Sequence, residues 1–304
     1  MSVFIIGSYA KALVMTTERI PLAGETLIGD DFRQTFGGKG SDMAVQAARL
    51  GADVTYSGVI GDDAFGHEFQ ALMKEEGINT QALRVTKELA TGAGLIIKDK
   101  HAKNVIVVDM GANKLYSKED VFEAKPLMND CEVALAQLEI PLETALYGMK
   151  IAKSLGKKTV FNPAPARDLR DLDLSDVDYL TPNETEARVA LGLEPDADIT
   201  DREVADKLLE TGCKYVVMTL GEHGSAVFSK DSTQIVKPCE VDVVDSNGAG
   251  DSFNAGLSVA LAEGKPIEEA VLFANATAAL CCKDWETVPS YKYRKEVDEF
   301  LAKQ

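Results

Sequence analysis

The sequence predicts an α/β fold in which helices cover both faces of a mostly parallel central sheet. Short apolar runs such as Val3–Ile6 and Tyr215–Met218 alternate with longer amphipathic stretches, which is typical of parallel strands joined by helices. Two stretches break this rhythm, at about residues 9–36 and 91–109, where extended segments follow one another without a helix. We therefore expect a small second sheet of antiparallel strands that covers a site as a lid.

The elements of the main sheet can be assigned along the chain from these patterns. The expected strands are Val3–Ile6, Val54–Ser57, Val133–Ala136, Thr159–Phe161, Tyr179–Leu180 and Tyr215–Met218. The expected helices cover residues 40–50, 64–76, 142–154, 184–191 and 201–211. The sequence has no repeat, low-complexity tract or Pro/Gly/Ser-rich linker, so we expect residues 1–304 to form a single domain.

The composition excludes several classes of protein. Forty-nine acidic and 32 basic side chains give a net charge of −17, which disfavours nucleic acid and anionic membranes as partners. The five cysteines are odd in number and none are in C-x-x-C spacing, so we expect a reducing, cytoplasmic location. The three histidines are widely spread, which makes a zinc site improbable. The sequence also lacks a signal peptide and an apolar stretch of roughly 18 residues, so neither secretion nor a membrane span is expected.

The most informative stretch is a glycine-rich turn that reads Asp-Ser-Asn-Gly-Ala-Gly-Asp-Ser-Phe over residues 245–253. We expect an apolar strand through Val243 and Val244 to run into this turn, and an amphipathic helix to follow it. The backbone amides of Gly248, Ala249 and Gly250 can then approach an anion closely, and the helix dipole adds positive potential. Asp251 in the first helical turn can accept a proton from an alcohol that attacks a phosphoryl group.

Taken alone, this motif also fits an ordinary helix N-terminus with a favourable acidic residue. Two other nucleotide-binding motifs are poor matches. No Gly-Lys-Ser/Thr follows a spaced glycine as a Walker A motif requires, and no G-x-G-x-x-G follows the first strand, which ends in Gly7-Ser8.

A second glycine-rich motif, Phe-Gly-Gly-Lys-Gly-Ser-Asp over residues 36–42, opens the helix expected at residues 40–50. Its paired glycines permit backbone conformations that other residues avoid, so its amides can face a polyhydroxylated ligand. With both motifs in view, the sequence resembles the ribokinase family of PfkB-type carbohydrate kinases. Residues 38–66 resemble the first signature of the family and residues 245–253 the second, and further ribokinase-like stretches follow in order at 162–167, 181–186 and 219–224.

This resemblance covers nearly the whole chain and implies a ribokinase-like three-layer αβα sandwich with a small β-sheet lid. It implies transfer of the ATP γ-phosphate to a sugar hydroxyl, expected to be a primary one, with Mg²⁺. Asp251 would be the base, and the amides of Gly248–Gly250 would form the anion hole. The implied sugar contacts are Gly38, Lys39, Asp42 and Glu139, and the implied nucleotide contacts are Asn183, Thr219, Gly221, Gly224 and Asn275.

The resemblance also implies two cation sites. Asn183 and Glu186 match an N-x-x-E motif that organises Mg²⁺ through water, which suits an ion that keeps its waters. Asp245, Asn247 and Ser290 match positions near a monovalent cation such as K⁺, although Glu286 replaces a glycine in that loop and leaves K⁺ activation open.

Several of these residues also have simpler interpretations. Glu186 fits an exposed helix residue, Asn275 a polar residue on a packed helix, and Glu139 an exposed carboxylate at a strand end. We expect Arg167 in a surface ion pair and His223 in a solvated loop.

Three residues depart from the family pattern in the expected sugar pocket. Ala10 and Ala12 stand where the family has an Asn and an Asp that contact ribose hydroxyls, and Asp42 stands where it has Asn. Ribose hydroxyls would therefore lose partners, so we expect a substrate other than plain ribose, such as a deoxy, branched, larger or amino-bearing sugar. Lys11 is expected to be an exposed lysine of the lid, or else to point inward towards an acidic substrate.

Two alternatives remain for the function: a nucleoside kinase on the same fold, and a non-catalytic sugar-binding regulator. Only the regulator predicts a missing base. The exposed edges of the lid strands and the habit of the family suggest a homodimer through the lid.

Overall fold

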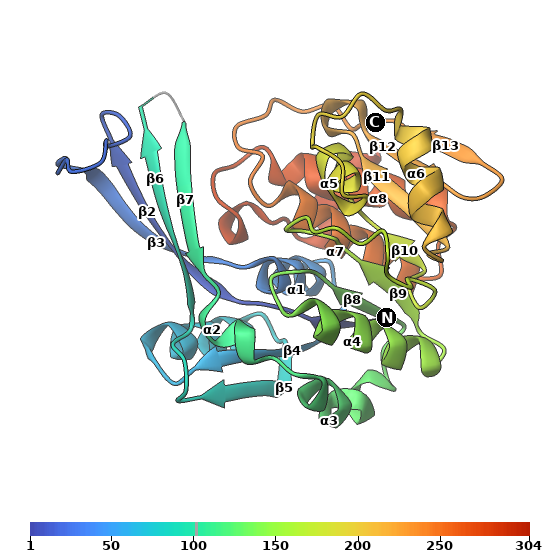
Figure 1. Cartoon of the computed structure of the whole chain (residues 1–304), viewed down its shortest axis with the longest axis horizontal. Coiled ribbons are helices and arrows are strands. Elements are labelled where there is room, and N and C mark those ends of the chain that lie inside the picture. The colour runs from blue at the N-terminus through green and yellow to red at the C-terminus, as the bar shows by residue number, and fades with distance from the viewer. Residues whose placement is uncertain (101–102) are drawn as a thin grey trace.

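The computed structural model describes residues 1–100 and 103–304 and contains two β-sheets, the larger of which lies among helices (Figure 1). The larger sheet has nine strands in the order β13-β12-β11-β10-β9-β8-β1-β4-β5. Neighbouring strands are parallel from β11 to β5, whereas β12 runs antiparallel to both of its neighbours. The strands are β1 (Ser2–Ile6), β4 (Asp53–Gly61), β5 (Asn79–Thr86), β8 (Val133–Ala136), β9 (Lys158–Phe161), β10 (Tyr179–Leu180), β11 (Tyr215–Thr219), β12 (Ser225–Phe228) and β13 (Thr233–Val236).

Helices cover both faces of this sheet and bury an apolar cluster on each. One cluster lies under α1 (Lys39–Arg49), α2 (Ala64–Glu75), α7 (Ala249–Ala262), α8 (Ile267–Cys281) and α9 (Arg294–Leu301). The other lies under α3 (Lys118–Met128), α4 (Leu142–Ser154), α5 (Glu184–Ala190) and α6 (Asp201–Glu210). Short 3₁₀ turns occur at η1 (Gly111–Leu115), η2 (Gly221–His223) and η3 (Val288–Ser290). The predicted three-layer arrangement around a mostly parallel sheet is thus confirmed.

The expected strands and helices of the main sheet are all present, but one further expected strand is wrong. Residues 237–248 adopt no regular structure, and the side chains of Val243 and Val244 are exposed. The amides of Val244 and Asp245 donate instead to the carbonyl of Cys282, the residue that follows α8. Apolar residues here predict a strand, but no neighbouring strand pairs with them.

The second sheet consists of β2 (Ala10–Thr17), β3 (Asp30–Gly37), β6 (Gly92–Asp99) and β7 (Asn104–Asp109), in the order β3-β2-β6-β7. Its outer pairs are antiparallel as expected, but the central pair β2–β6 is parallel. The reason lies in the main sheet. Strands β1 and β5 run in the same direction, so their carboxyl ends lie at the same end of the strands of that sheet. The next strands in the chain, β2 and β6, start there and continue in a common direction.

The two faces of this smaller sheet have different surroundings. Arg33 Nη1 lies 3.4 Å from Glu286 Oε1, and the Lys98 ammonium lies 5.6 Å from the centroid of the Trp285 ring, so one face turns towards the loop before η3. Ala10 and Ala12 share this face, because side chains alternate along a strand and Arg33 pairs with Val14. The opposite face carries exposed apolar side chains: Met15, Leu95, Val105 and Val107.

Lys11 differs from the expected exposed lysine of the lid. It is only 4% exposed, and its ammonium lies 2.5 Å from Glu68 Oε2 on α2 and 4.7 Å from the Phe36 ring centroid. The lysine thus attaches the base of the smaller sheet to α2, and its charge is already paired. Within residues 1–100 and 103–304, every helix is too short or too polar to cross a membrane.

Candidate active site

The first turns of α1 and α7 meet beyond the carboxyl end of β1, and the two helices pack against each other (Figure 1). Gly38 and Gly248 precede them with φ of 93° and 78°, in the left-handed region that favours glycine. Lys39 begins α1, and its Nζ lies 3.8 Å from Oδ1 of Asp251 in the first turn of α7. The fold therefore brings together the two glycine motifs, which are distant in the sequence, and with them one ammonium group and one carboxylate.

Asp251 is buried, with 7% of its surface exposed. Its Oδ1 has no hydrogen-bond partner in the part of the chain that the structure describes. Burial raises the pKa of Asp251 to about 6, Lys39 opposes this shift, and Glu139 and Glu186 add to it. Such a carboxylate is mostly ionised at neutral pH, yet it is basic enough to take a proton from an attacking alcohol.

Glu139, which follows β8, is bound to the start of α1. Its Oε2 accepts hydrogen bonds from the Lys39 amide (2.8 Å) and from Ser8 Oγ (2.7 Å). Gln137 Nε2 in turn donates to Ser8 Oγ over 2.8 Å. The carboxylate is half-buried and helps to cap the helix, so the alternative of an exposed strand-end residue is wrong. Ser8 and Gln137 were absent from the predicted site, although both stand directly beside its motifs.

Asp42 lies one turn into α1 and is almost fully buried, with 2% exposed. Thr287 Oγ1 lies 3.3 Å from its Oδ1 and 3.2 Å from the carbonyl oxygen of Phe36. Thr287, from the loop before η3, therefore connects the helix to the end of β3. No motif in the sequence indicates this residue.

A groove with about 770 Å³ of space runs from the start of α7 along α8. This volume suits a nucleotide-sized ligand. The predicted residues Asn183, Thr219, Gly221, Gly224, Ala249, Gly250 and Asn275 all line it. Sequence reasoning missed the rest of the wall, chiefly Pro238–Val241, Phe253, Ala278, Ala279 and Cys282.

Asn275 supports the wall of this groove. Its Oδ1 accepts a hydrogen bond from Ser225 Oγ (2.6 Å), and its Nδ2 donates to the carbonyls of Val236 (3.4 Å) and Lys237 (3.1 Å). The amide therefore joins α8 to the end of β13, which orders the chain that continues along the groove. Asn254 has a similar role in α7, because its Oδ1 accepts from Thr181 Oγ1 (2.6 Å) two residues before Asn183.

Asn183 and Glu186 form a reciprocal cap at the start of α5. Asn183 Oδ1 accepts from the Glu186 amide (2.7 Å), and Glu186 Oε2 accepts from the Asn183 amide (2.9 Å). Glu186 is half-buried, and burial raises its pKa against the opposing effects of the Asn183 amide and the Lys39 ammonium. The Lys39 ammonium, which lies 3.8 Å from Asp251 Oδ1, is thus close enough to Glu186 to oppose this rise in its pKa.

These residues fit Mg²⁺ bound through water and phosphate. Among the residues described, no cluster of three or more His, Cys, Asp or Glu side chains forms a metal cage. The cap uses Glu186 Oε2 and joins this carboxylate to Asn183, which lines the groove. Mg²⁺ typically keeps several waters and binds one or two carboxylates together with substrate phosphates.

The residues expected near a monovalent cation lie in one loop region. Asp245 accepts hydrogen bonds from the amides of Asn247 (3.0 Å) and Glu286 (3.3 Å), and the buried Ser290 hydroxyl donates to the Thr287 carbonyl (2.7 Å). Glu286 has φ of 70°, so its backbone adopts the conformation of the glycine that the family pattern has there. Arg167 and His223 are exposed and line neither the groove nor the Lys39–Asp251 pair.

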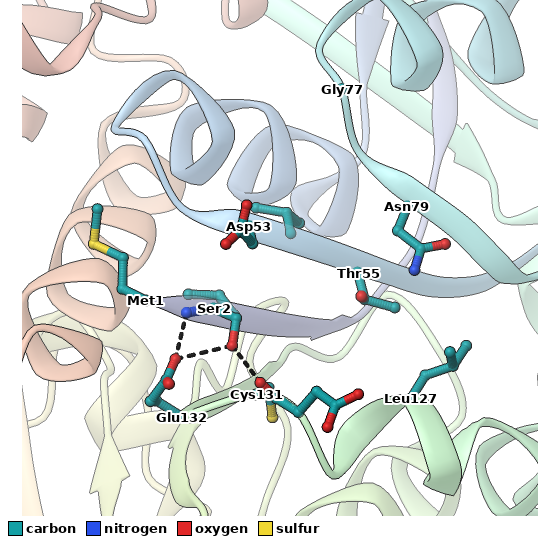
Figure 2. A pocket seen from close by; sticks show the side chains of 12 residues that line it. Met1, Ser2, Asp53, Thr55, Gly77, Asn79, Leu127, Cys131 and Glu132 are labelled. Atoms are coloured by element: carbon teal, nitrogen blue, oxygen red, sulfur yellow. Dashed lines mark hydrogen bonds between the residues drawn. The ribbon is translucent and has the colours of Figure 1, made fainter.

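A second hollow, with about 470 Å³ of space, lies at the amino ends of the strands, beside Ser2, Asp53, Asn79 and Glu132 (Figure 2). There the Ser2 hydroxyl donates to Glu132 Oε2 over 2.9 Å, and the Ser2 amide donates to the same oxygen. Ligands of open α/β sheets bind at the carboxyl ends of the strands, and this hollow lies at their amino ends. It is therefore not the candidate site.

Comparison with known proteins agrees with this geometry. Residues 1–292 match the model of the pfkB family of carbohydrate kinases. The chain is 36% identical to a ribokinase of Haemophilus influenzae, covering 98% of this chain and 97% of the relative, and 32% identical to a deoxyribokinase of Salmonella typhi, covering 99% of both. It is also similar to the structure of Arabidopsis thaliana ribokinase complexed with ribose and ATP, with a TM-score of 0.87, 28% identity, and coverage of 99% and 98%.

The two glycine-initiated helices allow a matched prediction. A Cβ at Gly250 would meet no heavy atom within 4 Å, so Gly250→Ala should leave the stability unchanged or raise it by up to about 1 kcal/mol. Its methyl group would occupy the space in front of the amides. Calorimetric titration should therefore show at least a tenfold loss of ATP affinity, about 1.4 kcal/mol.

The control is Gly40→Ala in α1, where a Cβ would lie 2.3 Å from the Ser8 amide nitrogen and 2.5 Å from Gly7 Cα. This backbone contact should lower the free energy of unfolding by about 1–3 kcal/mol, as measured by urea denaturation. An unchanged ATP affinity in Gly250→Ala would contradict the assignment of Gly250 to a ligand site.

Proposed function

The chain belongs to the pfkB family of carbohydrate kinases and is a phosphotransferase with a hydroxyl acceptor, and on this premise we propose that it transfers the γ-phosphate of ATP to a primary hydroxyl of a sugar. One observation carries the proposal: a buried carboxylate oxygen of Asp251 lacks a hydrogen-bond partner among the described residues and stands at the start of α7, beside a nucleotide-sized groove. The unpaired cysteines support a reducing cytoplasm as its compartment.

In this proposal Asp251 takes the proton of the acceptor hydroxyl as its oxygen attacks phosphorus. Among the described residues the helix has no side-chain cap and no acceptor is bound to the amides of Gly248 and Gly250, so these amides are available to stabilise the charge that develops on the moving phosphoryl group. The Ala249 amide donates to the Ser246 carbonyl over 3.3 Å and would have to exchange that contact for the phosphoryl group. The Lys39 ammonium, 3.8 Å from Asp251, keeps the base ionised. The reaction consumes ATP and yields ADP and a sugar phosphate.

Mg²⁺, held through water by Glu186 and Asn183, would neutralise charge on the transferred phosphates. Asn183 lines the groove, and the reciprocal cap fixes the orientation of Glu186 relative to it. Asp245, Asn247 and Ser290 are the proposed surroundings of a monovalent cation, and the glycine-like backbone of Glu286 supports a K⁺ site there.

We propose the smaller sheet as a lid over the acceptor, with Gly38, Lys39, Asp42 and Glu139 at its base. The face of this sheet that turns to the body presents Ala10 and Ala12, which offer no hydrogen bonds to an acceptor. This supports a substrate other than plain ribose. The small, apolar side chains of Ala10 and Ala12 also support a nucleoside as the second candidate acceptor, because a base needs apolar space.

A panel of pentoses, hexoses, ketoses and nucleosides, assayed for ADP formation, tests the proposal. Wild type should phosphorylate at least one acceptor, and Asp251→Asn should lower kcat by about 10²–10⁴-fold because the proton has no acceptor. Retained ATP binding, measured by calorimetry, controls for folding. A wild type that binds sugar without forming ADP would instead indicate a regulator.

The pKa of Asp251 predicts the pH dependence. The rate should rise as the pH increases through about 6, because only the ionised carboxylate accepts the proton. The Lys39 ammonium lowers this pKa, so Lys39→Met should move the acid limb of kcat/KM upward by about one to three pH units. Lys39→Arg, which keeps the charge, should leave the limb near its original position. An unmoved limb in Lys39→Met would refute the coupling.

We also propose a homodimer through the outer face of the smaller sheet. Met15, Leu95, Val105 and Val107 are between 39% and 63% exposed on that face, and a patch of this kind usually contacts a partner. Light scattering should give the mass of two chains for wild type and of one chain for Val107→Lys. Leu272→Lys, an exposed site on α8, is the control that should stay dimeric. A monomeric wild type would exclude the dimer.

A further inference from the structure

The centre of the active site has an imbalance of charge. The Lys39 ammonium is influenced by four carboxyl groups, those of Asp251, Glu139, Glu186 and Asp42. A single ammonium cannot balance four ionised carboxylates in a buried setting, because desolvation disfavours each charge that lacks its own partner. At least one of these groups is therefore expected to hold a proton.

The hydrogen bonds identify the group that is least able to remain ionised. Glu139 accepts from an amide and a hydroxyl, Glu186 accepts from an amide, and Asp251 has the Lys39 ammonium at 3.8 Å. Among the described residues, the only hydrogen-bond partner of the Asp42 side chain is the hydroxyl of Thr287. A buried carboxylate without an N–H donor is poorly compensated for the loss of water.

The position of Thr287 points in the same direction. Its Oγ1 lies 3.2 Å from the Phe36 carbonyl oxygen and 3.3 Å from Asp42 Oδ1. A threonine hydroxyl has one proton to donate, and the carbonyl and an ionised carboxylate would both require it. If Asp42 is protonated, both contacts are satisfied: the carboxylic acid donates to Thr287 Oγ1, and Thr287 donates to the carbonyl.

We propose that Asp42 acts as a neutral carboxylic acid, and that this selects an uncharged polyol as the acceptor rather than an amino sugar. A protonated carboxyl group offers a donor and an acceptor to ligand hydroxyls, as an amide does, whereas an ionised one only accepts. The choice of acceptor rests on the proposed kinase function, but the protonation of Asp42 does not.

The groups that face Asp42 support its neutrality. They are Lys39 on α1, Asp251 on α7, Glu139 after β8, Tyr9 after β1, Tyr56 on β4, Cys281 at the end of α8 and Tyr291 after η3. Only Lys39 among them favours the ionised form. Burial, followed by the charges of Asp251 and Glu139, raises the pKa of Asp42 well above its ordinary value, while Thr287 and Lys39 oppose the shift.

The first test measures stability and needs no substrate. If Asp42 takes up a proton on folding, wild type loses stability as the pH rises above the ordinary aspartate pKa of about 4, because the unfolded chain holds fewer protons. Asp42→Asn has no such loss. The difference in Tm between this variant and wild type should therefore grow by about 2 °C per pH unit between pH 5 and the raised pKa of Asp42.

Asp231→Asn, in the exposed turn between β12 and β13, is the matched control, and its Tm difference from wild type should be constant with pH. A constant difference for Asp42→Asn as well would show that Asp42 is ionised and would overturn the inference.

The second test uses the panel acceptor with the highest kcat/KM and its 2-amino analogue. For wild type, the KM of the neutral acceptor should rise by at least about tenfold as Asp42 ionises at high pH, whereas that of Asp42→Asn should stay flat. The amino analogue should bind no better than the neutral sugar. A tenfold preference of wild type for the amino analogue, lost in Asp42→Asn, would overturn the proposed acceptor class. If the Tm difference widens but no acceptor is phosphorylated, the proposed function fails and the protonation of Asp42 stands.

Discussion

The contact between Lys39 and Asp251 is the interaction on which the site depends. It joins the first turns of α1 and α7, which are more than 200 residues apart in the sequence, and it is possible only because a glycine precedes each helix with a positive φ. Gln46 reinforces the packing, because its Oε1 accepts from Ser252 Oγ on α7 at 3.2 Å. The glycine turns, the helix ends and the buried carboxylate therefore form a single unit.

The meeting of the two helix ends also compensates part of the negative charge of the site. Two helix N-termini contribute positive potential, and their amides and Lys39 are the main compensation for four carboxyl groups. Such a site suits Mg²⁺ together with a nucleotide, because each phosphate brings in charge that the metal and the amides neutralise. It is poorly suited to an acidic acceptor. Lys11 does not offer such an acceptor a free positive charge, because it is already paired with Glu68.

The small sheet depends on the main sheet for its geometry. Its two central strands, β2 and β6, start at the same end of the main sheet and are therefore parallel. Because side chains alternate along β2, the two faces of the small sheet carry different residues. One face brings Arg33 and Lys98 to the loop that also holds Thr287, while the other exposes apolar side chains.

The sequence by itself determined the main strands and helices, the glycine turns and the identity of the candidate base, because these depend on local periodicity and on backbone freedom within a few residues. It did not give the parallel pairing of β2 with β6, the irregular path of Val243, or the paired state of Lys11. Only the tertiary structure decided that Thr287 meets Asp42 and that Asn275 supports the groove wall. Those contacts join residues far apart in the chain, and their energies depend on burial and on the charges around them, which no local pattern contains.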